Sequence, residues 1–425
     1  MTELIHSKSA EGIHPSLDLF QIPPTQTSVE KKRIIKIPPV SDNESVITFR
    51  YEGCGDFIDL SESYFLFRLK LLKGDADLVA NDDIGVVNNI LDSMISQLHI
   101  KVGNHTIKQD IKLQAYSAYL NYLFAPQDVQ KSTLLTQGWV KDTPEQLDDK
   151  AIGDAAANKG HNARSLPFAT SKVVEIRGRI HHGLCLQDRY ILDEVPLEFE
   201  LTLNPKSFFL FGLNTSNFKI IKKELQLCGV KVSEDVKSAM MVDAPARYPF
   251  MDMKLLTRTF AANTTQIDIG NLYSGTLPTR LIIGMVATKA FQGAFDKNPY
   301  NFIHNKMKRV ELKVNGFLIP EGGYELDFEN NHYSEAYLNM VQGIGALEKQ
   351  IGVLTPKEFA NGYTLLVYNL RADDLDDCFE LQKSGTLSLR ITFPADGVAS
   401  ETTLLCFMEF QKILEISQAR TVTVI

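Results

Sequence analysis

Two stretches of ten residues, LHIKVGNHTI (98–107) and VELKVNGFLI (310–319), decide the fold of this chain because they are two copies of one unit. They align without gaps at an offset of 212 residues (310 minus 98). Each copy has two short runs of mainly alternating apolar and polar residues on either side of a Gly-Asn or Asn-Gly pair. Because these residues tolerate a positive φ, they suit the type I′ turn of a two-residue hairpin. The sequence therefore predicts the same β-hairpin in each half of the chain.

A short helix is predicted a few residues after each hairpin. The stretches AYSAYLNYLF (115–124) and HYSEAYLNMV (332–341) carry residues that can pack at positions i, i+3, i+4, i+7 and i+8, which lie on one helix face. The two sets are offset by 217 residues (333 minus 116), and they are Tyr116, Tyr119, Leu120, Leu123 and Phe124 in the first half and Tyr333, Ala336, Tyr337, Met340 and Val341 in the second. The helix is therefore part of the repeated unit.

The second helix opens with residues that also occur in acid-base and nucleophilic sites, namely His332, Ser334 and Glu335. In a helix, Ser334 and Glu335 point away from the face that holds Tyr333 and Tyr337, so adjacency alone makes no nucleophile-base pair. The first helix has alanine at the positions equivalent to His332 and Glu335. We therefore predict a packing helix with a solvated outer face, and we predict no catalytic residue in the chain.

Alternation with a period of two dominates the chain beyond residue 45. PLEFELTL (196–203) and TLSLRITF (386–393) place large apolar residues on one face and polar residues on the other, as in a strand buried on one side. These strands correspond at an offset of 190 (386 minus 196), so 27 residues (217 minus 190) are extra in the first half. We assign them to the polar loop from Pro126 to Lys172, where we expect an outward projection or a contact between subunits.

The repeats indicate a tandem duplication. We predict an all-β fold of two tandem jelly-roll β-sandwiches with a few short helices in the loops. A half of about 180 residues that keeps a helix inside its strand order fits a jelly roll better than an immunoglobulin sandwich. The expected organisation is an extended N-terminal arm (1–45), a first jelly roll (46–235), a linker (236–247) and a second jelly roll (248–425).

Composition limits the classes of function. The 425 residues are 44% apolar and 23% charged, which are ordinary values for a globular protein. The net charge of −8 argues against a protein that binds nucleic acid over its whole surface. We find no signal-peptide pattern and no apolar run long enough to span a membrane. Five widely spaced cysteines without a C-x-x-C pair predict neither a zinc site nor a disulfide framework, and they fit a reducing compartment.

The remaining polar motifs predict no metal and no cofactor. His181 and His182 are adjacent, so on a strand they would point to opposite faces, whereas a cupin-type metal site needs its histidines on one face. The acidic run RADDLDDCFE (371–380) lacks the glycine and the terminal glutamate of a calcium loop, so we expect a solvated turn.

A basic cluster in the expected arm is the one candidate binding site. It consists of Lys31, Lys32, Arg33 and Lys36. Four positive charges in an extended segment can contact nucleic acid or an acidic protein surface, and a solvated tail is the alternative.

Several separate phrases also carry a likeness to known proteins. They are LDLFQIPPTQTSVEKK, VVNNILDSMISQLHIKVGNHTI, YSAYLNYLF, KNPYNFIHNKMKRVELKVNG and YELDFENNHYSEAYLNM. In these phrases the chain resembles the major capsid proteins of Maverick/Polinton elements and adintovirus-like viruses, from about Leu17 to about Arg420. The resemblance implies a double jelly-roll capsid protein without enzymatic activity, three copies of which form a pseudo-hexagonal homotrimeric capsomer. Such capsomers tile an icosahedral shell around double-stranded DNA.

The same resemblance implies the partners and the location of the chain. The partners would be two further copies, neighbouring capsomers and a penton (minor capsid) protein, with DNA contacted only indirectly and no small-molecule substrate. The protein would be made and assembled inside a host cell, would not be secreted, and would end in the virion. The arm would lie beneath or between capsomers, where the basic cluster could make an inter-capsomer contact.

Two other classes stay open from the sequence. A non-viral jelly-roll protein that binds carbohydrate or another ligand would need an exposed aromatic platform, and the single tryptophan, Trp139, lies in a polar loop. An enzyme on a β-sandwich would need histidines and carboxylates that converge, and we find no such set in the sequence.

Overall fold

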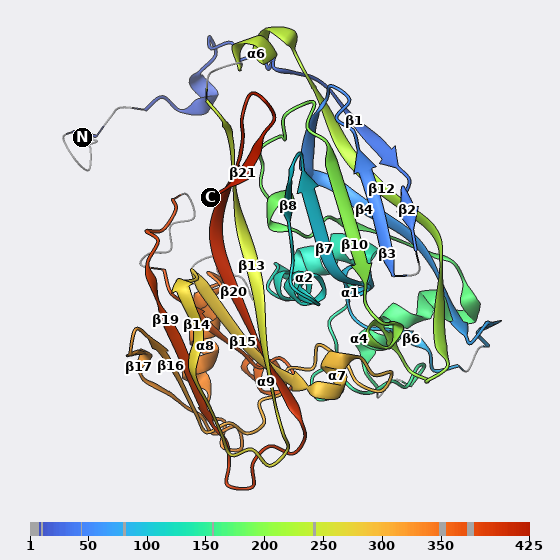
Figure 1. The fold of residues 1–425 in the computed structure, drawn as a ribbon, viewed down its shortest axis with the longest axis vertical. Coiled ribbons are helices and arrows are strands. Elements are labelled where there is room, and N and C mark those ends of the chain that lie inside the picture. The colour runs from blue at the N-terminus through green and yellow to red at the C-terminus, as the bar shows by residue number, and fades with distance from the viewer. Residues whose placement is uncertain are drawn as a thin grey trace.

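The computed structural model of the chain describes residues 8–9, 12–43, 45–79, 82–154, 157–240, 244–347, 354–371 and 378–425. Within these ranges the chain forms two β-sandwiches that stand side by side, with the first on the right and the second on the left in Figure 1. The acidic residues of 373–377 lie outside the described ranges, so the expected solvated turn stays a prediction.

The first sandwich consists of two facing sheets. One sheet has the order β1-β12-β4-β5, with β9 also paired to β4, and the other has the order β2-β3-β10-β7-β8. Their strands are β1 (Val29–Ile37), β2 (Ser41–Asp42), β3 (Val46–Tyr51), β4 (Phe57–Lys73), β5 (Ala76–Asp77), β7 (Ile95–Val102), β8 (His105–Ile107), β9 (Val174–Arg179), β10 (Leu197–Leu203) and β12 (Ser216–Val232). A small third sheet pairs β6 (Gly85–Val86) with β11 (Leu210–Phe211).

The second sandwich repeats this arrangement. Its sheets have the orders β13-β20-β15-β18, with β21 paired to β20, and β14-β19-β16-β17. Their strands are β13 (Ala246–Phe260), β14 (Gln266–Thr276), β15 (Arg280–Ala287), β16 (Arg309–Val314), β17 (Phe317–Glu325), β18 (Leu365–Asn369), β19 (Ser384–Thr392), β20 (Thr402–Ile416) and β21 (Val422–Val424). The pairs β1-β12-β4-β9 and β13-β20-β15-β18 therefore correspond strand by strand, as do β3-β10-β7-β8 and β14-β19-β16-β17. The all-β, double jelly-roll prediction is confirmed.

Short helices and 3₁₀ turns occupy the connections. The helices are α1 (Ile90–Ser93), α2 (Leu113–Leu123), α3 (Gln127–Gln130), α4 (Lys159–Ser165), α5 (Lys206–Phe209), α6 (Glu234–Ala239), α7 (Thr288–Gln292), α8 (Ser334–Gly343) and α9 (Pro356–Ala360). The 3₁₀ turns are η1 (Pro15–Leu17), η2 (Thr133–Gln137), η3 (Leu166–Ser171) and η4 (Gly183–Cys185). No helix among the described residues is long and apolar enough to span a membrane.

Both predicted hairpins are present, but their turns differ. Each has a two-residue loop, since Val102 pairs with His105 and Val314 pairs with Phe317. In the second hairpin both loop residues, Asn315 and Gly316, have a positive φ, as a type I′ turn requires. In the first hairpin Gly103 has a positive φ of 56° and the following asparagine does not, which is the pattern of a type II′ turn. The type I′ prediction is thus right for the second hairpin and wrong for the first.

The predicted arm is too long. Residues 29–37, which include the basic cluster, form strand β1 at the edge of the first jelly roll, where Lys36 lies opposite Gln226 of β12. Ile37 is 8% exposed and Ile35 packs against the hydrophobic core, so the strand is held by side chains as well as by backbone hydrogen bonds. The first jelly roll therefore begins at Val29. The expectation was wrong because five of the nine residues of β1 are charged, which hides the inward positions Ile35 and Ile37 in the sequence.

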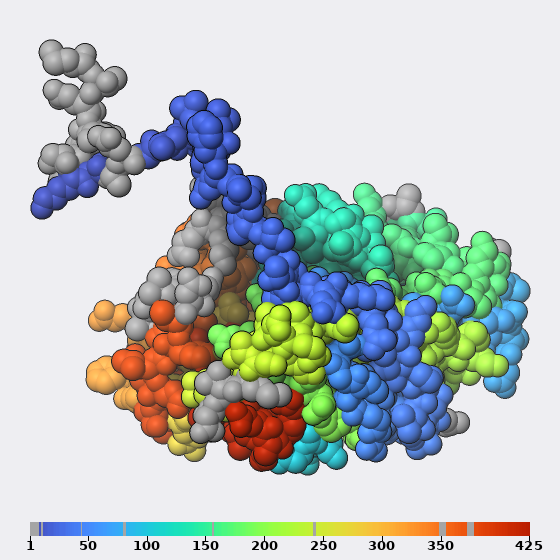
Figure 2. Space-filling view, turned by 90° about the horizontal axis from the view of Figure 1, so that it is seen from above, coloured from blue at the N-terminus to red at the C-terminus, as the bar shows by residue number. Residues whose placement is uncertain are grey.

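The described part of the arm, residues 12–28, leaves the body of the protein. Figure 2 shows this blue segment projecting from the molecule. Its large apolar side chains are mostly exposed, with Phe20 at 94% and Ile22 at 88%. In the single chain these side chains therefore form a row of solvent-exposed apolar groups.

The loop from Pro126 to Lys172 is not an outward projection. It contains α3, η2, α4 and η3, of which η2, α4 and η3 pack on strands of the first jelly roll, and residues 141–148 of the loop lie between the two jelly rolls. Trp139 is 1% exposed and Leu147 is 1% exposed, and both belong to the hydrophobic core that runs through both sandwiches. The prediction of an outward tower was wrong because the polar residues of this loop bond to one another inside the protein. A contact between subunits at this loop stays untested.

Candidate functional site: the interface between the two jelly rolls

Helix α2 forms the centre of the contact between the two jelly rolls. Nine of its eleven residues are buried, although its apolar stripe alone covers one face. The helix is also buried on the side of the second jelly roll, because the ring of Tyr116 meets four aromatic rings there at centroid distances of 5.6 to 6.4 Å. These are the rings of Phe291, Tyr300, Phe302 and Phe407. The helix therefore belongs to the first jelly roll by sequence and to both by packing.

A second tyrosine pair joins the same surfaces. The ring of Tyr119 on α2 stacks on that of Tyr300 at a centroid distance of 4.0 Å with an interplanar angle of 4°. The Tyr300 hydroxyl lies 2.5 Å from the Ser93 hydroxyl of the first jelly roll, and the Tyr116 hydroxyl donates to the Pro299 carbonyl at 3.1 Å. Burial raises the pKa of Tyr116 and Tyr119 well above the usual value of a tyrosine, so both remain neutral hydroxyl groups.

Lys112, which directly precedes α2, places a cation at this boundary. Its ammonium group donates to the Phe291 carbonyl and lies over the rings of Phe208, 5.0 Å away, and Phe291, 4.3 Å away. Burial lowers the pKa of Lys112 to about 8, because charge is disfavoured away from water. The two rings and the carbonyl offset part of that cost.

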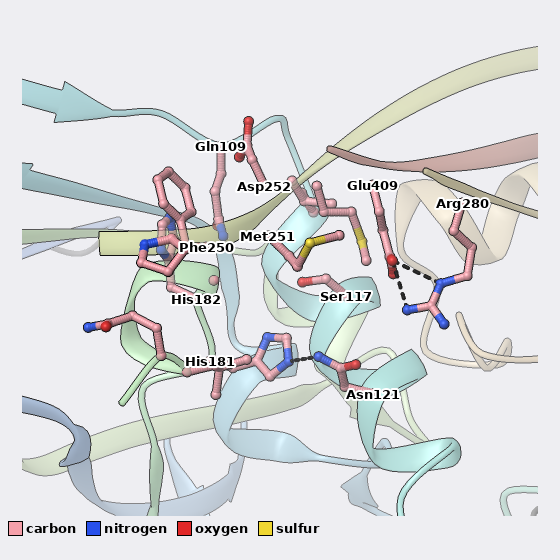
Figure 3. A pocket seen from close by; sticks show the side chains of 16 residues that line it. Gln109, Ser117, Asn121, His181, His182, Phe250, Met251, Asp252, Arg280 and Glu409 are labelled. Atoms are coloured by element: carbon pink, nitrogen blue, oxygen red, sulfur yellow. Dashed lines mark hydrogen bonds and ion pairs between the residues drawn. The ribbon is translucent and has the colours of Figure 1, made fainter. Parts of the chain in front are cut away.

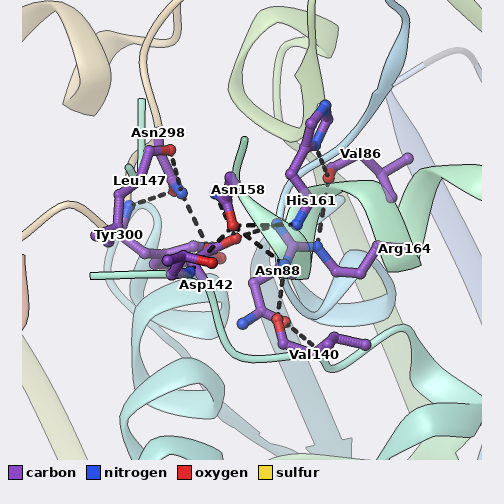
Figure 4. A network of polar contacts seen from close by, with 12 residues as sticks. Val86, Asn88, Val140, Asp142, Leu147, Asn158, His161, Arg164, Asn298 and Tyr300 are labelled. Carbon is purple, nitrogen blue, oxygen red and sulfur yellow. Dashed lines mark hydrogen bonds and ion pairs between the residues drawn. The ribbon is translucent and has the colours of Figure 1, made fainter. Parts of the chain in front are cut away.

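A buried polar network around Asp142 ties the inward loop to the second jelly roll (Figure 4). The carboxylate of Asp142 accepts from Arg164 at 2.7 Å, from Asn158 at 2.9 Å and from Asn298 at 3.1 Å. Its backbone carbonyl accepts from the Tyr363 hydroxyl at 2.7 Å. The side chains of Asp142 and Arg164 are 0% and 1% exposed, so each charge depends on the other.

A cavity of about 390 Å³ lies between the jelly rolls beside α2 (Figure 3). One wall carries Ser117, Asn121, His181 and His182 from the first jelly roll, and the other carries residues 249–253 of β13 with the Arg280–Glu409 ion pair. In the lining of the cavity the two backbones nearly touch, since a Cβ on Gly183 would lie 1.8 Å from the Met251 carbonyl oxygen.

The histidines in this cavity are not arranged as metal ligands. His181 Nε2 lies 2.6 Å from the Asn121 side-chain amide, and His182 Nδ1 accepts from the backbone amide of Leu184 at 3.2 Å. Burial lowers the pKa of both imidazoles to about 4, so they are neutral at pH 7. They lie at the interface as polar packing groups.

One group of possible metal ligands lies close together among the described residues, namely Asp59, Glu62 and Cys228. The ammonium group of Lys32 lies 3.0 Å from a carboxylate oxygen of both Asp59 and Glu62. A protein cation therefore takes the place that a metal ion would need. Burial also raises the pKa of the Cys228 thiol to about 11, which keeps it protonated.

In the structure, two residues of the predicted basic cluster form ion pairs and the other two are exposed. Lys32 pairs with Asp59 and Glu62, and Arg33 pairs with Asp56 through a distance of 2.5 Å. The hydrogen bond that Lys32 donates to Asp59 raises the pKa of Lys32 above its usual value. Lys31 and Lys36 are exposed on β1. The four residues thus lie on a strand of the first jelly roll, and two of them pair with acids at the start of β4 or directly before it, across the intervening strand β12.

The second predicted helix packs on one side only. Tyr333, Ala336 and Met340 are buried, Tyr337 is half-buried with its hydroxyl donating to the Leu354 carbonyl at 2.7 Å, and His332 is exposed. Ser334 and Glu335 are exposed as well, and the described residues bring no base to Ser334. The packing prediction for this helix is confirmed by these positions.

Sequence reasoning missed the residues that join the two halves. Asp142, Arg164 and Tyr300 lie in segments without periodicity, and their partners are more than 100 positions away in some cases, as for Asp142 and Tyr363. One signal was available: α2 has Ala115 and Ala118 where α8 has longer polar residues, and small residues allow a second layer to approach.

The two sandwiches and their packing define a double jelly-roll protein. No known family model matches the chain. An uncharacterized protein of Caenorhabditis elegans is 22% identical over 430 aligned positions, which cover 94% of this chain and 98% of that protein.

Solved structures of viral capsids have the same fold. A chain of the Sputnik virophage structure matches with a TM-score of 0.68 and 13% identity, over 100% of this chain and 94% of that chain. The mavirus major capsid protein matches with a TM-score of 0.56 and 11% identity, over 100% and 97% of the two chains. A chain of the PBCV-1 virus capsid matches with a TM-score of 0.58 and 10% identity, over 95% and 98%. At these identities the likeness shows the fold, and it extends over both jelly rolls.

Proposed function

We propose that this protein is a major capsid protein, a structural building block of the virion of an icosahedral double-stranded DNA virus or a related Maverick/Polinton element. The observation that carries the proposal is the packing of two jelly rolls of one strand order in a single chain, joined by an apolar interface of their own. A ligand-binding or catalytic protein has no need for two such sandwiches without a convergent polar site. A capsomer needs them, because three chains then supply six similar sandwiches around a threefold axis.

The proposed working unit is a homotrimer. The interface centred on α2 holds the two jelly rolls of each chain together as a rigid pair. Trimer formation then requires contacts only between the pairs of different chains. This interface contains two buried charges and a cluster of five aromatic rings. Separating the two jelly rolls would expose both the charges and the apolar surface, so the contact within a chain is expected to be permanent. Neighbouring capsomers and a penton protein are the further partners of this proposal, with DNA enclosed but contacted only indirectly.

The apolar arm supports contact beyond the trimer. Ile13, Leu17, Leu19, Phe20 and Ile22 are 67% to 94% exposed in the single chain. We expect removal of residues 1–27 to leave a folded trimer and to impair assembly of shells. The cut ends before Val29 because β1 belongs to the first jelly roll. Shells of normal number and size from the shortened protein would contradict this role of the arm.

Electron microscopy of the purified protein tests the proposal. The expected result is particles of hexagonal outline with threefold symmetry, together with shells at high protein concentration. Images that show only single pairs of sandwiches over the micromolar range would contradict the proposed function.

A further inference from the structure

We propose that the cavity between the two jelly rolls is a binding site for a small, neutral molecule that carries an amide group and an apolar body. Such a ligand would contact both jelly rolls of one chain at once. The inference goes beyond the proposed function and does not depend on the trimer, because both walls of the cavity belong to a single chain.

The cavity is large for a contact within one chain. Its volume of about 390 Å³ lies within the range of roughly 300 to 1,000 Å³ that is typical of ligand pockets. Protein interiors are otherwise close-packed, with few voids larger than a water molecule. Elsewhere along α2 the interface is packed in this way, since Tyr119 stacks on Tyr300 at a centroid distance of 4.0 Å. The open space beside α2 is therefore a distinct feature of this interface.

The cavity can be reached from solvent. Leu186, which lines it directly after η4, is 43% exposed, and Asn121 on α2 is exposed as well. The wall also carries Ser117, His181 and His182, which are all buried. A ligand would therefore enter past the exposed residues and place its polar group against the buried ones.

His181 offers an unused hydrogen-bond donor to this cavity. Its Nε2 lies 2.6 Å from the Asn121 amide nitrogen, which can only donate, so Nε2 accepts and the ring proton lies on Nδ1. This Nδ1 is buried and has no hydrogen-bond partner among the described residues. Figure 3 shows it on the side of the ring that faces Ser117 and Met251, toward the middle of the cavity. A buried donor without a partner is costly, so an acceptor oxygen at this place would stabilise the protein.

Two further groups complete the polar part of the wall. The Ser117 hydroxyl donates to the Gln114 backbone carbonyl at 3.3 Å, so its oxygen can accept a hydrogen bond from a ligand. His182 Nδ1 accepts from the Leu184 amide, so the proton of this ring lies on Nε2, which can donate. The wall thus presents donors together with an acceptor. An amide group matches this set, because its oxygen accepts and its nitrogen donates.

The charges that face the cavity are already paired, which favours a neutral ligand. Arg280 donates to Glu409 at 2.8 Å, and the ammonium group of Lys412 lies 2.6 Å from the Asp252 carboxylate. The two histidines are neutral at pH 7, because burial lowers the pKa of both to about 4. A carboxylate or an ammonium group brought into this space would lose its water without gaining a free counter-charge. An amide avoids that cost.

Apolar side chains form the rest of the wall. Leu113 of α2 and Leu186 come from the first jelly roll, and Phe250, Met251 and Met253 come from β13 of the second. Methionine side chains are flexible and adapt to apolar groups of different shape. The ligand therefore needs an apolar body beside its amide group. By contacting both walls it would hold the two jelly rolls together.

Calorimetric titration of the full chain with hexanamide tests the proposal. Hexanoate and hexylammonium are the comparison probes, because they have the same number of carbon atoms and carry a negative or a positive charge. We expect hexanamide to bind with a Kd of about 1 mM or tighter, as a ligand of this size can. We expect the two charged probes to bind about tenfold more weakly or not at all, because of the cost of burying their charge. Absence of hexanamide binding well above that Kd, or equal binding of the three probes, would overturn the inference.

Two substitutions locate the binding site. His181→Leu removes the donor and should weaken hexanamide binding about tenfold, since the amide oxygen then lacks its partner. Leu186→Trp places a larger side chain at the exposed part of the cavity and should weaken binding by a similar factor. The matched control is Leu135→Trp on η2, where the leucine is 50% exposed and is not part of the cavity wall. It should bind hexanamide as tightly as the natural chain does.

Leu186→Trp also keeps the test valid if His181→Leu does not fold, because the side chain that it replaces is partly in solvent. Hexanamide binding that is unchanged in Leu186→Trp, or that is weakened equally in Leu135→Trp, would overturn the inference. Hexanamide binding by a natural chain that stays monomeric would leave this inference standing and would count against the proposed function alone.

Discussion

Helices α2 and α8 occupy corresponding places in the two jelly rolls, yet one is buried on all sides and the other on one side. Both carry the same stripe of apolar positions, so the stripe does not decide the difference. The surroundings of the helix decide it: Tyr116 and Tyr119 on α2 pack on rings of the second jelly roll, and Ala115 and Ala118 beside them are buried. On α8 Glu335 is exposed, and so is His332 just before the helix. Duplication thus preserved the core of each sandwich and assigned different neighbours to its outer surfaces.

The largest expected effect comes from removing a buried charge at the interface between the two jelly rolls. Asp142→Ala leaves the guanidinium of Arg164 buried without its carboxylate, which typically costs about 3 to 5 kcal/mol. We expect the free energy of unfolding, measured in urea, to fall by this amount. The matched control is Asp268→Ala, which removes a half-exposed partner of Arg390 and should cost about 1 kcal/mol or less. Equal effects of the two changes would show that the Asp142 network does not hold the halves together.

Removing the ring of Tyr116 should rank next. It takes away the side chain that meets four rings of the second jelly roll, and the loss of a buried aromatic residue costs about 3 kcal/mol or more. We expect Tyr116→Ala to lower stability by this amount in urea denaturation. Limited proteolysis should then cleave between the jelly rolls faster than within them. A variant as stable as the natural chain would contradict the assignment of α2 to the interface.

A smaller effect should follow from the histidines beside α2. The folded-state pKa of His181 and His182 is about 4, below the usual 6.5, so the unfolded chain binds protons first as the solution becomes acidic. Their contribution to stability is complete above pH 6.5 and is lost as pH falls toward 4, by about 2 kcal/mol for one histidine between pH 6.5 and pH 5.

Asp92 acts in the opposite direction. Burial raises its pKa to about 7, so its cost to the folded state shrinks as pH falls below 7. We therefore compare the natural chain with His181→Gln/His182→Gln, in which Asp92 is unchanged. The melting temperature of the natural chain should fall more steeply between pH 6.5 and pH 5 than that of the variant. Parallel curves would show that these imidazoles are not buried in solution.

The smallest effects should come from α8. Tyr337 is half-buried, so Tyr337→Ala should lower the free energy of unfolding by roughly 1 to 2 kcal/mol, about half the loss expected for a fully buried ring. The periodicity alone would have predicted about 3 kcal/mol, because it treats Tyr337 as a core residue. His332 is exposed, and His332→Ala should change stability by about 0.5 kcal/mol or less. If His332→Ala were the more damaging change, the packing role of this helix would be wrong.

Much of this architecture could be predicted from the sequence, and the parts that could not be predicted depend on contacts between residues far apart in the chain. The hairpins and the strands around PLEFELTL and TLSLRITF are local patterns, so they were found. Strand β1 was missed because its pairing with β12 bridges nearly 200 residues and its composition is that of a tail. The Asp142 network was missed for the same physical reason, since its four partners converge only after both sandwiches have formed.

The mass of the protein in solution tests the central claim most directly. Light scattering on the natural chain at micromolar concentration should give about 143 kDa, three times the 47.7 kDa of one chain, because three chains supply six similar sandwiches around a threefold axis. A mass that stays near 47.7 kDa across that range would contradict the account of this protein as a trimeric capsid building block.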